Sequence, residues 1–141
     1  MTIEQAVAKE NRTKPRIVLS AEDYGRLSAL ATAASSRMPE LAADLADEIE
    51  RAHVLARGRL PADTVCMHSE VEFRDDTTGK IQTVTLVYPG EADISQHRVS
   101  VLTPVGTALI GLRSGHSITW ETPTGQVRQL TVLSVSNART N

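Results

Sequence analysis

The sequence is poor in aromatic residues and carries no excess of positive charge. Only 3% of its 141 residues are aromatic, namely Tyr24, Phe73, Tyr88 and Trp120. Proteins that bind single-stranded nucleic acid stack its bases on several exposed rings, so this composition argues against that class. The formal net charge is -2 and no basic block is present. This argues against sequence-independent DNA binding, which depends on neutralising phosphates.

Cysteine and long hydrophobic runs are also scarce. Cys66 is the only cysteine, so no disulfide can form within the chain, as is typical of a reducing compartment. Residues 1–16 are polar and charged and lack the apolar segment of a signal peptide. No run of about 18 apolar residues predicts a membrane span. We therefore expect a cytoplasmic protein that contacts no membrane.

The first half of the chain predicts a pair of helices. Ser20 and Asp23 have the spacing of a capping box, in which a hydroxyl caps the third amide and the acid reaches back. Pro39 suits the first turn of a second helix, and Pro61 follows its expected end. The stripes at helical spacing are Tyr24, Leu27, Leu30, Ala31 and Ala34, and then Leu41, Leu45, Ile49, Ala52 and Leu55 or Ala56.

Two stripes separated by a four-residue connector, 35–38, indicate an antiparallel helical hairpin, a truncated coiled coil. Helices of about 16 to 18 residues would be about 24 to 27 Å long. Glu40 and Asp44 are four residues apart, which places two carboxylates on one helix face near the hairpin tip. Such a pair can hold a divalent cation. It can also simply suit the positive end of a helix, and we favour this second interpretation.

The second half of the chain changes to the period of a sheet. Val65, Met67, Ser69, Val71 and Phe73 alternate with polar residues, which is typical of a half-buried strand. The pattern predicts strands over 65–74, 81–88, 98–102, 117–121 and 128–135 and a short helix over 104–112. The expected fold class is therefore α+β, with a helical hairpin in front of an antiparallel sheet.

No motif of an enzyme or of a metal site is present. Gly106 and Gly111 have P-loop spacing, but Leu112 and Arg113 stand where a P-loop has Lys and Ser or Thr. We interpret these glycines as relieving crowding and capping a helix. None of the four histidines has metal-ligand spacing to another or to the cysteine. We expect no cofactor and no metal.

The segment "YPGEADISQHRVSVLTPVGTALIGLRSG" contains several ordered features. They are a Pro-x-Glu-Ala-Asp turn, a Thr-Pro corner and an Ala-Leu-Ile-Gly helix, and a Thr-Pro-x-Gly hairpin follows them at 122–125. In this order they resemble the C-terminal domain of the bacterial Gre transcript-elongation factors. The resemblance covers roughly residues 65–135.

The resemblance implies an FKBP-like sheet domain over 61–137, preceded by a hairpin over 17–60 and a tail over 1–16. It also implies docking at the rim of the RNA polymerase secondary channel. We place the centre of the docking surface at Thr103, Pro104 and Val105, although Pro104 also suits the start of a helix. Glu91 and Asp93 either orient on a basic patch of the polymerase or stabilise their own turn, and we favour the turn.

The hairpin departs from the family. In Gre factors it is about twice as long, enters the channel, and uses acidic tip residues to help the polymerase hold magnesium and cleave backtracked RNA. Here the tip reads "SSRMPE", and a hairpin some 20 Å shorter is not expected to reach the active site. The short hairpin and the segment "VCMHS" at the start of the sheet resemble the Rnk branch of the family.

We therefore expect a monomeric transcription regulator that is no enzyme. It would compete with Gre factors on the polymerase and meet nucleic acid only through the polymerase complex. One alternative is a transcript-cleavage factor that uses Glu40 or Asp44. Another is a module that binds a different protein. A third is a prolyl isomerase, which fold analogy alone suggests and which the scarcity of aromatic residues disfavours.

Overall fold

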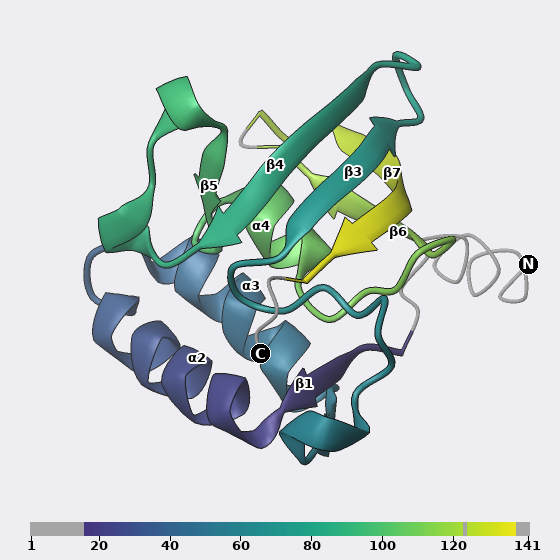
Figure 1. The fold of residues 1–141 in the computed structure, drawn as a ribbon. Coiled ribbons are helices and arrows are strands. Elements are labelled where there is room, and N and C mark those ends of the chain that lie inside the picture. Colours follow the sequence, from purple (N-terminus) through teal and green to yellow (C-terminus); the bar gives the residue numbers. More distant parts are fainter. Residues whose placement is uncertain (1–15, 123, 138–141) are drawn as a thin grey trace, which may run out of the picture.

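The computed structural model describes residues 16–122 and 124–137, so the predicted tail, apart from Arg16, lies outside the described residues. Helices α2 (Ala21–Ala34) and α3 (Pro39–Glu50) pack side by side next to a five-stranded sheet. A shorter helix, α4 (Pro104–Leu109), packs against that sheet (Figure 1). The arrangement confirms the α+β class. None of the described helices has the length and hydropathy needed to cross a bilayer.

Side-chain caps set the starts of the helices. The hydroxyl half of the predicted capping box is confirmed, because Ser20 Oγ accepts a hydrogen bond from the backbone N–H of Asp23 at 3.0 Å. The Asp23 carboxylate reaches across to the segment before the sheet, where it accepts from the N–H of Met67 at 3.3 Å. Pro39 stands in the first turn of α3, as expected. The buried faces of the two helices include Leu27 and Leu45, both fully enclosed.

The predicted extent of the second helix is wrong. Helix α3 ends at Glu50, and 53–55, expected to be helical, forms strand β2 (His53–Leu55). This strand pairs in parallel with β1 (Val18–Ser20), and the N–H of His53 donates to the carbonyl of Ile17 at 2.9 Å. Pairing with a distant segment satisfies the backbone here, so tertiary contacts override the helical periodicity.

The sheet has the strand order β5-β4-β3-β7-β6. The central strand β3 pairs antiparallel with both of its neighbours, and β7 pairs antiparallel with β6. The expectation of an antiparallel sheet is wrong at one edge, because β4 and β5 run parallel. The bounds are β3 (Glu70–Asp75), β4 (Ile81–Val87), β5 (Arg98–Ser100), β6 (Ser117–Glu121) and β7 (Val127–Ser136).

Two predicted elements are shorter than expected for reasons of backbone geometry. The alternation from Val65 holds, since the apolar positions and Ser69 are all buried, but β3 begins only at Glu70. His68 has a φ of 74°, a left-handed conformation that no strand accommodates. The helix predicted over 104–112 ends at Leu109, because Ile110 leaves the helical conformation with a ψ of 130° and Gly111 follows with a φ of 82°.

A single buried cluster joins the helices to the sheet. It contains Leu27 and Leu45 from the helices together with Val71 and Leu130 from the strands. Gly111 lets the chain pass close to Ile17, a member of this cluster, because a Cβ at Gly111 would lie 2.7 Å from the Cβ of Ile17. The helical pair is thus fixed against the sheet by the same core that holds the sheet together.

Candidate functional site

The predicted Thr-Pro corner is a rigid start of α4. Thr103 Oγ1 accepts from the N–H of Gly106 at 3.0 Å and donates to the carbonyl of Ser100 at 2.7 Å. Pro104 takes the first helical position, where its missing N–H has no cost. Thr103, Pro104 and Val105 are each half-buried. The side-chain oxygen at this corner is used to build the turn, while the proline ring borders open space.

That open space is a hollow of about 220 Å³ between α3, α4 and the β6–β7 end of the sheet. Pro104 and Ala108 border it from α4, and Ile118 and Trp120 border it from β6. Its third side comes from α3, which contributes the acids Asp44, Asp47 and Glu48. The hollow therefore has apolar walls on the sheet side and an acidic wall on the helical side.

The structure separates the two acids predicted at the hairpin tip. Glu40 is exposed in the first turn of α3 and does not border the hollow, whereas Asp44 does. Asp44 thus faces the Thr-Pro corner. Within the part of the chain that the structure describes, no group of three or more His, Cys, Asp or Glu side chains could hold a metal ion.

The acid that lies deepest in the wall is Glu48, which is 5% exposed. Its carboxylate accepts two hydrogen bonds from the Arg51 guanidinium, at 2.7 and 3.1 Å. Burial of a carboxylate is costly without such a partner. Asp44 and Asp47 are exposed, so they present the negative charge of this wall to solvent.

Glu91 stabilises its own turn. Its carboxylate accepts from the N–H of Tyr88 at 3.2 Å and lies 2.8 Å from Nε2 of His68. The hydrogen bond with His68 holds the pKa of Glu91 below its usual value, and the bond from Tyr88 adds to this. The turn is thereby connected to the segment in front of β3.

Asp93 has the same kind of role one turn later. It accepts from the backbone N–H and the hydroxyl of Ser95 at 3.1 and 2.7 Å. The hydroxyl bond is the main reason why the pKa of Asp93 is lowered. Both acids thus form hydrogen bonds within their own turns, and neither borders the hollow.

Sequence reasoning missed the residues that face Pro104. Asp47 and Glu48 belong to no sequence motif, and the sequence gives Trp120 no role beyond being one of four aromatic residues. One signal was available, because Trp120 is the single tryptophan of the chain and stands in a short strand. Its Nε1 atom is buried and has no hydrogen-bond partner among the described residues, which is unusual for a buried indole.

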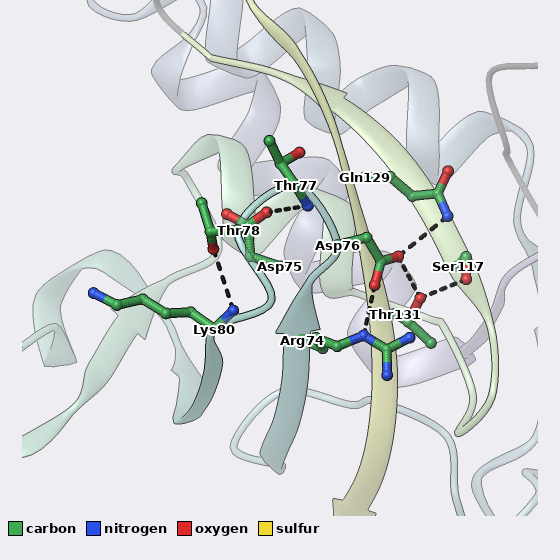
Figure 2. A network of polar contacts seen from close by, with 9 residues as sticks. All are labelled: Arg74, Asp75, Asp76, Thr77, Thr78, Lys80, Ser117, Gln129 and Thr131. Atoms are coloured by element: carbon green, nitrogen blue, oxygen red, sulfur yellow. Dashed lines mark hydrogen bonds and ion pairs between the residues drawn. The ribbon is translucent and has the colours of Figure 1, made fainter.

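A second polar cluster lies at the turn between β3 and β4 and is structural. Asp76 accepts from Arg74 at 2.7 Å, Thr131 at 2.6 Å and Gln129 at 3.1 Å (Figure 2). Burial alone would raise the pKa of Asp76, but these hydrogen bonds outweigh it and lower the pKa. Because three side chains donate to the Asp76 carboxylate, we interpret the cluster as structural.

Comparison with known proteins identifies the family. Residues 60–137 match the family described as "Transcription elongation factor, GreA/GreB, C-term", and residues 15–55 match "Rnk N-terminus". Over 123 residues the chain is 37% identical to the "Regulator of nucleoside diphosphate kinase" of Escherichia coli, covering 87% of this chain and 90% of that protein. It is 30% identical over 130 residues to "Transcription elongation factor GreA" of Beijerinckia indica subsp. indica, covering 86% and 83%.

A solved structure agrees with the sequence matches. The fold is similar to "Prokaryotic transcription elongation factor GreA/GreB from Nitrosomonas europaea", with a TM-score of 0.68, 36% identity, and coverage of 88% of this chain and 100% of the other. The chain belongs to the GreA/GreB family of transcription elongation factors, and in front of the C-terminal domain of that family it carries an N-terminal segment of the Rnk type.

Proposed function

We propose that this protein regulates transcription by binding RNA polymerase at the entrance of the secondary channel. There it competes with Gre factors without cleaving RNA. Membership of the GreA/GreB family supports the polymerase as partner, since factors of this family act on that enzyme. The protein then works in the bacterial cytoplasm as a monomer. It needs no cofactor and meets nucleic acid only through the polymerase complex.

The observation that carries the absence of cleavage is the position of Asp44 against the Thr-Pro corner. Cleavage by a Gre factor requires acids at the tip of a long hairpin, and here Glu40 is the single candidate left in the first turn of α3. Helices α2 and α3 contain 14 and 12 residues, which corresponds to about 21 and 18 Å of length. A hairpin of this size occupies the channel mouth and stops short of the catalytic metal.

The docking surface in this proposal is centred on Thr103, Pro104 and Val105. An FKBP-like domain over 61–137 presents this corner, and the antiparallel hairpin over 17–60 stands beside it. Glu91 and Asp93 hold the neighbouring loop in one shape. Interfaces of this kind depend on shape match and complementary charge, and the 220 Å³ hollow beside Pro104 supplies both apolar and acidic surface.

A backtracked elongation complex with 3′-labelled RNA tests the proposal. The protein is titrated in while displacement of a labelled Gre factor and shortening of the RNA are measured together. We expect displacement at micromolar protein without shortening. Absence of displacement would contradict the polymerase assignment and leave a module that binds another protein.

The second candidate function is transcript cleavage, which the exposure of Glu40 at the hairpin tip favours. It predicts magnesium-dependent shortening of the RNA that disappears in Glu40→Ala. Asp44→Ala would abolish shortening of the RNA only if α3 moved away from the sheet. Comparison of Glu40→Ala with Asp44→Ala therefore shows which carboxylate takes part in cleavage.

A further inference from the structure

We infer that the hollow between α3 and α4 receives a lysine or arginine side chain of the polymerase, so that the helical pair is itself part of the docking surface. This inference rests on the proposed function and specifies the chemistry that the site recognises. It assigns a binding role to Asp44, Asp47 and Trp120.

The charge of the hollow favours a cation. Asp44 and Asp47 both border it from α3 and both reach solvent. The third acid, Glu48, forms an ion pair with Arg51 at 2.7 Å. No Lys, Arg or His occurs among the described residues that line the space. Two carboxylates at a partly enclosed surface attract a positive group more strongly than they would in open water.

The opposite wall suits the remainder of a basic side chain. Trp120 borders the hollow from β6, and tryptophan is the aromatic residue that attracts a cation best. Pro104, Ala108 and Ile118 provide apolar surface along which the methylene stem of a lysine or arginine can pack. A hollow with acids on one side and an indole on the other matches both parts of such a side chain.

The backbone of β6 adds hydrogen-bonding groups at the rim. Two hydrogen bonds show which residues of β6 bond to β7. The N–H of Val132 donates to the His116 carbonyl at 2.9 Å, and the N–H of Thr122 donates to the Gln126 carbonyl at 2.8 Å. In an antiparallel pair alternate residues bond to the partner strand, so the N–H and carbonyl of Thr119 point away from β7.

Thr119 also borders the hollow, and its backbone groups have no partner in the described ranges. Its carbonyl can accept from a guanidinium, which carries five N–H donors. An arginine side chain in the hollow therefore satisfies a backbone carbonyl that has no partner in the part of the chain that the structure describes.

The first test compares two double variants in the displacement assay. D44N/D47N removes both charges and keeps the side-chain sizes. E50Q/E70Q is the matched control, because it removes two exposed acids that do not border the hollow. We expect D44N/D47N to bind polymerase about tenfold more weakly with a flatter dependence on salt, and the control to bind like the parent.

The outcomes separate this inference from the proposed function. If the parent protein fails to displace a Gre factor, the proposed function falls, and this inference with it. If the parent binds and D44N/D47N binds equally well with the same salt dependence, this inference alone is overturned.

A second measurement does not depend on removing any acid. The photo-crosslinker p-benzoylphenylalanine is placed at Val127, which borders the hollow and is 49% exposed, or at Ile81, which is 56% exposed and does not border it. We expect the Val127 position to cross-link to polymerase beside a lysine or arginine, and the Ile81 position to give no adduct there. A Val127 derivative that binds polymerase and yields no adduct, or one remote from any basic residue, overturns the inference.

Discussion

Gly106 lies where α4 passes closest to the backbone in front of it. A Cβ at this position would lie 2.1 Å from the carbonyl oxygen of Ser100 and 2.8 Å from Cα of Val101. Both atoms belong to the main chain, so no side-chain rotation relieves the contact. The glycine spacing that superficially suggests a phosphate loop is explained by this crowding, as the sequence interpretation held.

Replacement of this glycine gives the first prediction. Gly106→Ala should lower the free energy of unfolding by about 1–3 kcal/mol, because the backbone of α4 must shift away from Ser100. Urea unfolding monitored by circular dichroism measures the change. Gly25→Ala is the matched control. Gly25 lies within α2 with nothing within 4 Å of the added methyl group, so it should gain up to about 1 kcal/mol. Equal stability of the two variants would contradict the crowding argument.

Asp76 links the turn between β3 and β4 to strand β7. Its N–H donates to the carbonyl of Gln129 at 2.8 Å, and its carboxylate accepts from side chains on β3 and β7 (Figure 2). Thr131 in turn shares a hydrogen bond with Ser117 on β6 at 2.7 Å. One carboxylate thus connects three strands, of which two are neighbours of the hollow.

Asp76 makes the stability of the sheet depend on pH. Its pKa in the folded protein lies below the ordinary value of 3.8. The stabilisation is therefore fully present above that value and is lost as the pH falls through the folded pKa. Asp76→Asn should cost about 1–3 kcal/mol near neutral pH, because it weakens charge-assisted bonds and turns an amide toward Arg74.

Urea unfolding of the parent and Asp76→Asn at pH 7 and at pH values below 3.8 measures this effect. The difference between the two proteins should shrink at the acidic end, where the parent carboxyl becomes protonated too. A difference that stays constant across the range would show that the network acts through packing and that its charge contributes nothing.

Sequence patterns gave the elements correctly where local rules decide, and failed where distant segments pair. The Ser20 cap and Pro39 set the helix starts as predicted, because caps act within a single turn. Strand β2 was missed, because its hydrogen bonds go to β1, more than thirty residues earlier. The late start of β3 follows from the left-handed backbone of His68, a conformation that is uncommon for a residue other than glycine.

In the candidate site, too, local sequence predicted some residues, while contacts between distant segments determined the others. Motif order alone singled out Pro104, and the structure places it at a hollow. The acids that face it could not be predicted as its neighbours, because the contact between α3 and α4 depends on how the helical pair packs on the sheet. Helical periodicity places Asp44 and Asp47 on one face but says nothing about what that face meets.

At the scale of the whole molecule, the hollow exists only while α3 is held against the sheet. The buried cluster runs without a break from Leu27 and Leu45 in the helices to Leu109 and Leu130 in the sheet part. Shared burial of this kind makes the parts stabilise one another. The helical pair and the sheet should therefore unfold together.

The last prediction uses Trp120 as a reporter at the border between the two parts. Urea unfolding monitored by far-UV circular dichroism, which follows the helices, should have the same midpoint as unfolding monitored by Trp120 fluorescence. Leu45→Ala, at a fully enclosed position of α3, should lower both midpoints together through a loss of about 2–5 kcal/mol. Loss of helix signal before any change in tryptophan emission would mean that α3 can leave the sheet. The acids of α3 would then change position, and the tip of the helical pair could extend further into the polymerase channel. That result would support the alternative in which Glu40 takes part in RNA cleavage.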